Sequence, residues 1–142
     1  MSAEPVRLFV YGSFLKGERD HALLAGATLE GEAQTAAEFS LFDLGVYPAL
    51  VRGGEQPIVG ETYLVLPSVR FHLDVRKECP LLFQREAIRL SDGSSADAYV
   101  MRWDQVRGRR KIWNGDWRRR FEPRPRASAD SPFARWAKGR FR

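Results

Sequence analysis

The most informative stretch of this sequence is Arg7-Leu8-Phe9-Val10-Tyr11-Gly12-Ser13-Phe14-Leu15. Its first five residues are rich in strand-forming side chains and Gly12-Ser13 is a loop signal, so the pattern predicts a strand that ends in a tight loop. A glycine at this point lets the backbone approach a ligand closely. Successive backbone N–H groups in such a loop can hold a carboxylate, although an ordinary strand-to-helix turn has the same pattern.

Further strand and helix signals follow along the chain. Asp20 is expected to cap a helix that begins near His21, and Ser68 to cap a second short helix after Pro67 ends the preceding strand. Runs of β-branched and aromatic residues bounded by turn residues predict strands at 38–44, 49–51, 58–65, 83–90 and 96–103. The order of these elements predicts an α+β fold in which a mixed or antiparallel sheet closes into a small β-barrel, with a few short helices.

The charge is distributed unevenly along the 142 residues. Residues 1–106 carry 10 Lys and Arg against 15 Asp and Glu, and residues 107–142 carry 13 against 3, which gives net charges of −5 and +10 within the total of +5. Prolines among the arginines near the end predict an irregular segment. We therefore expect one domain at 1–121 and a basic, irregular tail at 122–142, which can attract phosphate or an acidic partner.

Several classes of protein are excluded or disfavoured. The single cysteine, Cys79, allows no internal disulfide, and one cysteine with two histidines does not supply the four closely spaced ligands of a zinc site. We expect no metal and no cofactor. No run of 18 apolar residues predicts a membrane span, and the N-terminus lacks the basic start and apolar run of a signal peptide. The expected location is the cytoplasm.

Several motifs, in one order along the chain, resemble those of the γ-glutamylcyclotransferase-like superfamily, and in particular of its γ-glutamylamine cyclotransferase branch. They are Tyr11-Gly12-Ser13 within residues 8–21, Gly45-Val46-Tyr47-Pro48-Ala49, Val59-Gly60-Glu61-Thr62-Tyr63, Leu73-Asp74 with Cys79-Pro80-Leu81-Leu82-Phe83-Gln84-Arg85, and Asp116-Trp117. Together they cover about residues 7–120 and are more specific than any one of them. The resemblance implies an α+β fold centred on a β-barrel with one pocket.

The resemblance also implies an activity. The family's enzymes release 5-oxoproline from γ-glutamyl compounds without a cofactor, because the substrate's own α-amine attacks its γ-carbonyl. Such a site needs a general base to take a proton from the amine. Glu61 shares a strand face with Tyr63 and is expected to face solvent, the alternative being the pocket. Tyr47 is expected in the pocket wall, and the family's loop for the γ-glutamyl head falls on Tyr11, Gly12, Ser13, Phe14 and Leu15.

One position departs from the family. Where the family has its catalytic glutamate this chain has Lys77, and Glu78 is the next residue. Three alternatives follow: Glu78 enters the pocket because the helix end is distorted before Pro80; burial lowers the pKa of Lys77, which then acts as the base; or the cyclotransferase chemistry is lost and the pocket binds or reacts with something else. A solvated pair of charged side chains is the alternative without a functional role. Because a protonated lysine would repel the substrate's ammonium group, we expect weak or no release of 5-oxoproline.

The expected partner is a small-molecule substrate or ligand, with no membrane association. Four tryptophans lie near arginines in the C-terminal part of the chain, a combination that permits stacking on bases. No recognised nucleic-acid motif accompanies them. Binding of nucleic acid or an acidic partner through the basic tail is therefore the lesser alternative, and the sequence predicts no oligomeric state.

Overall fold

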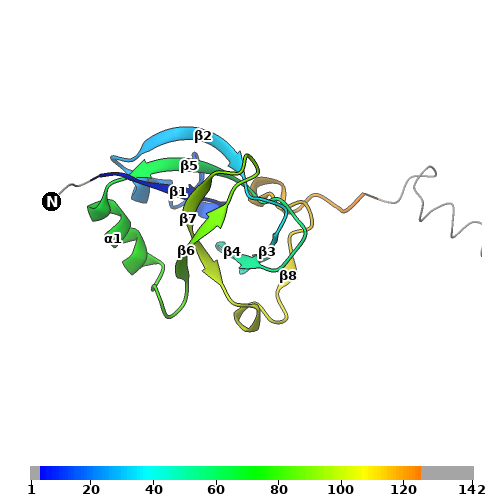
Figure 1. Cartoon of the computed structure of the whole chain (residues 1–142). Helices are drawn as coiled ribbons and strands as arrows, with labels where there is room; N and C mark the ends of the chain where they lie inside the picture. Colours follow the sequence, from blue (N-terminus) through cyan, green and yellow to red (C-terminus); the bar gives the residue numbers. More distant parts are fainter. Residues whose placement is uncertain (1–3, 126–142) are drawn as a thin grey trace, which may run out of the picture.

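The fold is a mixed sheet that curls into a half-barrel, seen in a computed structural model that describes residues 4–125 (Figure 1). Its strands are β1 (Val6–Val10), β2 (Thr28–Gln34), β3 (Phe39–Asp43), β4 (Pro48–Arg52), β5 (Val59–Val65), β6 (Gln84–Arg89), β7 (Ser95–Met101) and β8 (Arg110–Lys111). The helices are α1 (Pro67–Arg76) and the 3-10 turns η1 (Gly12–Phe14), η2 (His21–Leu24), η3 (Trp103–Gln105) and η4 (Trp117–Arg119). The predicted α+β class with a mixed, barrel-like sheet is confirmed.

The strands run in the order β2-β5-β1-β7-β4-β3-β8, and β6 pairs with β7. β7 is parallel to both β1 and β4, whereas every other pairing is antiparallel. β1 therefore lies inside the sheet, with Val6 opposite Val65 on one side and Leu8 opposite Asp97 on the other. This position makes the end of β1 a firm support for the loop that follows it.

The run from Leu8 to Tyr11, at the end of β1, has no charged residue because both faces of the strand are buried there. Leu8 and Val10 belong to one cluster of buried side chains, and Phe9 and Tyr11 belong to another. Alternate residues of a strand point to opposite faces, so the two clusters lie on the two sides of the sheet. Leu73 of α1 joins the first cluster, which attaches the helix to this side.

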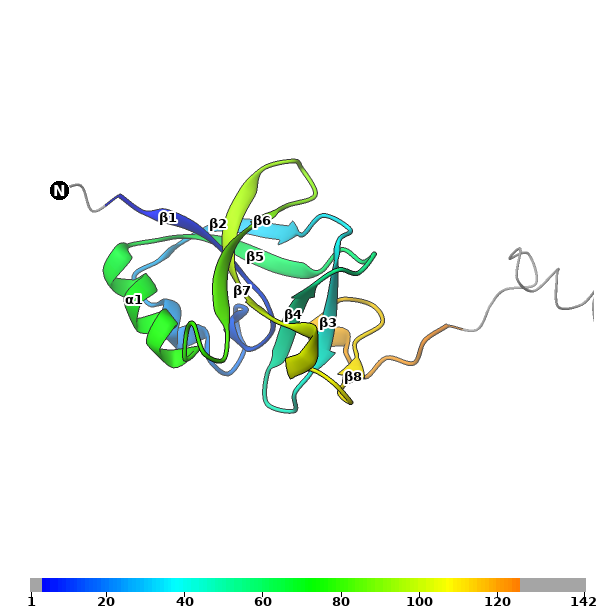
Figure 2. The ribbon, with the colours of Figure 1, turned by 60° about the horizontal axis from the view of Figure 1, so that its bottom comes forward.

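The helix α1 lies at the end of the sheet next to the segment between β1 and η2, away from β3, β4 and β8 (Figures 1 and 2). It begins at Pro67 itself, with Leu66 as the preceding cap residue. The expectation that Ser68 caps this helix was therefore wrong, because proline is well suited to the first helical position. Asp20 does precede η2, but its side chain makes no capping hydrogen bond.

The sequence signals missed two strands. β2 pairs along its length with β5, but its sequence contains a glycine and two glutamates and most of its residues are exposed. Such an edge strand has little β propensity, and its position depends on the pairing partner. β8 consists of Arg110 and Lys111 and lies in the strongly basic part of the chain, where no strand was expected.

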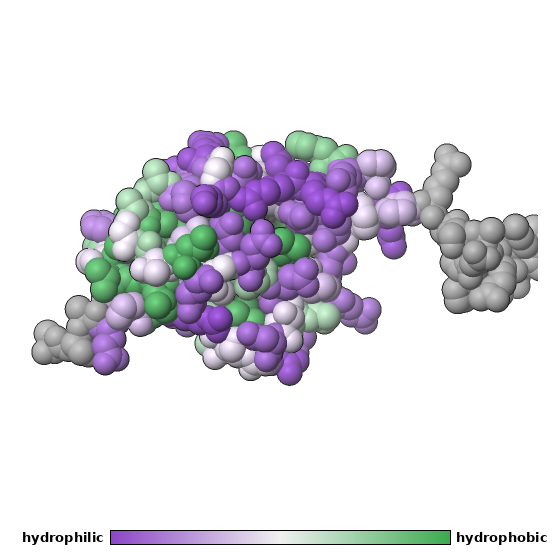
Figure 3. Space-filling model, turned by 90° about the horizontal axis from the view of Figure 1, so that it is seen from above, coloured by the Kyte–Doolittle hydropathy of each residue, from purple (hydrophilic) through white to green (hydrophobic). Residues whose placement is uncertain are grey.

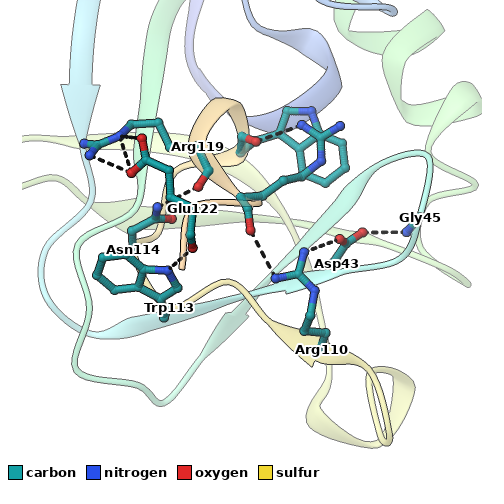
Figure 4. Close-up of polar contacts among 9 residues, drawn as sticks. Asp43, Gly45, Arg110, Trp113, Asn114, Arg119 and Glu122 are labelled. Carbon is teal, nitrogen blue, oxygen red and sulfur yellow. Dashed lines mark hydrogen bonds and ion pairs between the residues drawn. The ribbon is translucent and has the colours of Figure 1, made fainter. Parts of the chain in front are cut away.

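The basic segment after β7 is folded against the sheet as far as Glu122 (Figure 4). The guanidinium of Arg110 binds the carboxylate of Asp43 at 2.7 Å, and the indole N–H of Trp113 donates to the carbonyl of Glu122 at 2.8 Å. Residues 126–142 lie outside the described part, so the expected irregular tail stays a prediction.

The outer surface seen in Figure 3 is largely hydrophilic, and apolar side chains gather toward the N-terminal end of the molecule. In the part of the chain that the structure describes, no helix combines the length and the apolar character needed to cross a bilayer.

Candidate functional site

A pocket of about 210 Å³ lies between three segments that are distant in the sequence. These are residues 14–20 after β1, residues 46–47 between β3 and β4, and residues 76–83 from the end of α1 to the start of β6. The sequence analysis expected the site at the Tyr11–Leu15 loop, at Tyr47 and at Lys77 or Glu78, and of that loop only Phe14 lines this pocket. Among the expected site residues, the pocket lining contains Phe14, Tyr47, Lys77 and Glu78.

The structure explains why residue 12 is a glycine, for a reason that the sequence did not indicate. Its φ is +66°, in the left-handed region, and a Cβ atom here would lie 2.3 Å from the ring of Pro48. Only glycine fits both the backbone conformation and this close approach. The Tyr-Gly-Ser loop and the Tyr47-Pro48 segment are thus in direct contact, and this contact holds Phe14 and Tyr47 around one pocket.

The other loop residues serve mainly to fix the loop. The hydroxyl of Tyr11 donates to the carbonyl of Tyr99 at 2.6 Å and accepts from the backbone N–H of Leu50 at 3.1 Å, so it links β1, β7 and β4. Burial raises the pKa of this phenol. Ser13 and Leu15 are buried and, like Gly12, do not line the pocket.

The end of α1 decides which charged side chain enters the pocket. The N–H of Cys79 donates to the carbonyl of Asp74 at 2.9 Å and that of Glu78 to the carbonyl of Val75 at 3.0 Å. This is the Schellman pattern, which requires a left-handed residue after the helix, and Glu78 adopts a φ of +49°. Glu78 is exposed, whereas the side chain of Lys77 is only 8% exposed.

The amine of Lys77 lies among aromatic rings, with no charged partner in the part of the chain that the structure describes. Its Nζ is 4.5 Å from the ring centre of Phe14, 5.2 Å from that of Tyr47 and 4.4 Å from that of Phe83. Within residues 4–125 no carboxylate lies within ion-pair distance of Nζ, and Nζ donates no hydrogen bond to any of these residues. Burial lowers the pKa of Lys77 from 10.5 to about 7, opposed by the charge of Asp20 and assisted by that of Arg76.

The remaining charges of the pocket have both signs. Asp20, Glu78, Arg19 and Arg76 line it together with Lys77. The carboxylate of Asp20 lies 3.6 Å from the guanidinium of Arg76 and is 16% exposed. A site with carboxylates, guanidiniums and an amine of lowered pKa can accept a zwitterionic ligand of small size.

The sequence analysis missed Asp20, Arg19 and Arg76 as pocket residues. Asp20 looked like a helix cap, and the only signal for another role was its short distance along the chain from the Tyr11–Leu15 loop. Its backbone N–H donates to the carbonyl of Ser13 at 2.8 Å, which brings it back toward that loop.

Glu61 is buried, at 6% exposure, so it does not face solvent, and it does not line the pocket either. Its Oε1 accepts from the backbone N–H of Lys16 at 2.9 Å and from the hydroxyl of Tyr63 at 3.2 Å. Arg118 of η4 lies 3.8 Å from its other oxygen and also donates to the carbonyl of Lys16. The expectation of a solvent-facing Glu61 was wrong, because this carboxylate holds the end of the loop against η4.

The part of the chain that the structure describes contains no group of three or more His, Cys, Asp or Glu residues able to hold a metal ion. The pocket lining offers carboxylates, guanidiniums, aromatic rings and the amine of Lys77.

Comparisons with known proteins agree with this geometry. The family model described as "Gamma-glutamyl cyclotransferase, AIG2-like" matches residues 8–119. A Vibrio cholerae protein named "Putative gamma-glutamylcyclotransferase" is 35% identical over 111 residues, covering 78% of this chain and 93% of its own length. "Gamma-glutamylaminecyclotransferase A" of Danio rerio is 32% identical over 109 residues, covering 67% of each chain.

Solved structures show the same fold. The ytfP protein of Escherichia coli has a TM-score of 0.62 at 31% identity, covering 78% of this chain and 95% of its own. An AIG2-like protein of Mus musculus has a TM-score of 0.61 at 22% identity, covering 91% and 92%. The family match spans all three segments that line the pocket, and the chain therefore belongs to the AIG2-like gamma-glutamyl cyclotransferase family.

Proposed function

We propose that this protein binds a small γ-glutamyl or related amine-bearing compound in the pocket and releases 5-oxoproline from it, with Lys77 as the general base. The observation that carries the proposal is the position of the Lys77 amine, which lies in the pocket among three aromatic rings and has no carboxylate partner within residues 4–125. Family membership supports the reaction class.

The charges of the pocket match a γ-glutamyl head, which carries an α-carboxylate and an α-ammonium. Arg19 and Arg76 are suited to the carboxylate, since guanidinium binds carboxylates through paired hydrogen bonds. Asp20 is suited to the ammonium. Phe14 would contribute the part of the Tyr11–Leu15 loop that faces the head, and β1, Pro48 and Glu61 fix this loop in place.

The reaction moves two protons from the α-nitrogen to the leaving nitrogen. Neutral Lys77 takes the first proton from the α-ammonium, and the freed nitrogen attacks the γ-carbonyl carbon. Lys77 then gives this proton to the leaving nitrogen, and the bond from the carbon to that nitrogen breaks. The ring nitrogen loses its second proton to Lys77, which passes it to the released amine. The products are 5-oxoproline and a protonated amine, and Lys77 is restored to its neutral form.

The low pKa of Lys77 removes the main objection to a lysine at this position. A lysine with its ordinary pKa is protonated at neutral pH and repels the substrate ammonium. With a pKa of about 7, close to half of the Lys77 amines are neutral at pH 7. A general base works best when its pKa is near the working pH. We therefore propose that 5-oxoproline is released slowly, at a rate that increases with pH.

The test is the rate of 5-oxoproline release from γ-glutamyl amides between pH 6 and pH 9. The rate should rise through a midpoint near pH 7, because only deprotonated Lys77 accepts a proton. Lys77→Met should lower the rate by about 10²–10⁴. Lys77→Glu should keep activity and move the midpoint to lower pH, and Lys111→Met, at an exposed lysine outside the pocket lining, is the matched control.

Two outcomes would contradict the base assignment. Abolition of turnover by Glu78→Gln, with Lys77→Met active, would make Glu78 the base. Tight binding of a γ-glutamyl compound without release at any pH would favour a non-catalytic member of the family that uses the same pocket.

A further inference from the structure

We propose that Lys77 is also a nucleophile, and that its side-chain amine forms an imine with a small aldehyde or ketone that carries a carboxylate. This goes beyond the proposed function, because intramolecular aminolysis forms no covalent bond to the protein. The pocket has room for such a ligand next to the amine, with a volume of about 210 Å³.

The surroundings of the amine are those of a reactive lysine. The rings of Phe14, Tyr47 and Phe83 lie 4.4–5.2 Å from Nζ and leave the side chain 8% exposed. In the described residues no carboxylate is close enough to hold a proton on the amine through an ion pair. A desolvated lysine of this kind keeps its lone pair available, which is the requirement for attack on a carbonyl.

The arginines of the pocket indicate the class of ligand. Arg19 is exposed at the pocket, and no ion pair of its side chain is found within residues 4–125. Arg76 lines the same pocket, and its guanidinium forms an ion pair with the carboxylate of Asp20. Guanidinium groups recognise carboxylates, so a ligand with a carbonyl at one end and a carboxylate at the other matches both parts of the pocket.

The reaction balances without an added oxidant or reductant. The nitrogen of neutral Lys77 attacks the carbonyl carbon, and a proton passes from nitrogen to oxygen in the resulting carbinolamine. The carbon–oxygen bond then breaks, and one water leaves as the carbon–nitrogen double bond forms. Asp20 lines the pocket together with Lys77, and we assign the proton transfer to its carboxylate.

Reductive trapping on the wild-type protein tests the proposal. The protein is incubated at pH 7 with 4-oxobutanoate and cyanoborohydride, and adducts are located by peptide mass spectrometry. An ordinary lysine is neutral in fewer than roughly one molecule in a thousand at this pH, so Lys77 should react at least about a hundredfold faster than the exposed Lys16 and Lys111. Equal labelling of the three lysines would overturn the proposal.

Two matched comparisons test the ligand class and separate this inference from the proposed function. Butanal, which lacks the carboxylate, should react at least about tenfold more slowly at Lys77, and Arg19→Gln should reduce this preference, since paired charge-assisted hydrogen bonds are lost. Equal rates for the two aldehydes would overturn the assigned class. A γ-glutamyl amide that occupies the pocket should slow the trapping of the aldehyde at Lys77. Trapping at an unchanged rate in the presence of the amide would support the imine and count against γ-glutamyl binding.

Discussion

Two buried charged side chains, Glu61 and Lys77, contact the same loop and differ in their partners. Glu61 accepts hydrogen bonds from the Lys16 backbone and the Tyr63 hydroxyl, and Arg118 lies 3.8 Å from it. Lys77 has only aromatic rings around its amine, among the residues that the structure describes. A buried charge that has hydrogen-bond partners stabilises the fold, whereas one without them must change its protonation or bind something else.

The two residues therefore have different roles, one in stability and one in activity. Glu61 fixes the loop from the side of η4, so its removal should cost stability. Among the described residues, the charged form of Lys77 has cation–π contacts with three rings but no hydrogen-bonded or ionic partner, so its removal should cost activity and leave the fold intact. A charged group kept buried without a partner is a frequent sign of a functional site.

The largest stability effect is expected for Glu61→Ala. The donors on Lys16 and Tyr63 would lose their acceptor, which costs about 1–3 kcal/mol for each donor left unpaired. The free energy of unfolding from urea denaturation measures the loss. Glu61→Gln keeps an acceptor oxygen and should lose clearly less. An unchanged free energy of unfolding in the alanine variant would contradict the structural role of Glu61.

The next effect is a pH dependence that Lys77 adds to stability. Between pH 7 and pH 9 an unfolded Lys77, with a pKa near 10.5, is protonated and the folded one, with a pKa of about 7, is largely neutral. The unfolded state then binds more protons, so stability rises with pH, by up to about 1.4 kcal/mol per pH unit. Denaturation of wild type and Lys77→Met across this range should show the slope only in wild type. Parallel curves would contradict it.

A smaller effect is expected at the end of α1. Glu78 has a φ of +49°, which costs a residue with a side chain about 1 kcal/mol that glycine avoids. Glu78→Gly should therefore raise the free energy of unfolding, and thermal denaturation can measure the change. A less stable variant would show that the Glu78 side chain, despite its exposure, makes a contribution greater than the backbone strain.

The smallest effect is expected for deletion of residues 123–142. Segments rich in proline and arginine bury too little apolar area to offset the entropy of ordering them. The melting temperature should change little. A deletion that begins at Trp117, which is 3% exposed, should lower it strongly. A large loss in the shorter deletion would show that the tail belongs to the fold.

The sequence predicted those parts of the site that depend on local patterns. The β1 strand and the loop at Tyr11 follow from an apolar run that ends in glycine, and the convergence of three motifs on one pocket follows from the family resemblance. The choice between Lys77 and Glu78 could not be predicted, because it depends on a left-handed helix cap at a residue that is not glycine. Glu61 was misjudged because its strand is buried on both faces.

A direct titration of the Lys77 side chain tests whether the pocket holds a neutral amine. Proteins labelled with ¹³C at the lysine ε-carbons can be followed by NMR between pH 5 and pH 11, with Lys77→Arg used to assign the signal. A midpoint near 7, well separated from the exposed lysines, is predicted. A midpoint near 10.5 would show that Lys77 is charged at neutral pH and would contradict both its role as a base and its role as a nucleophile.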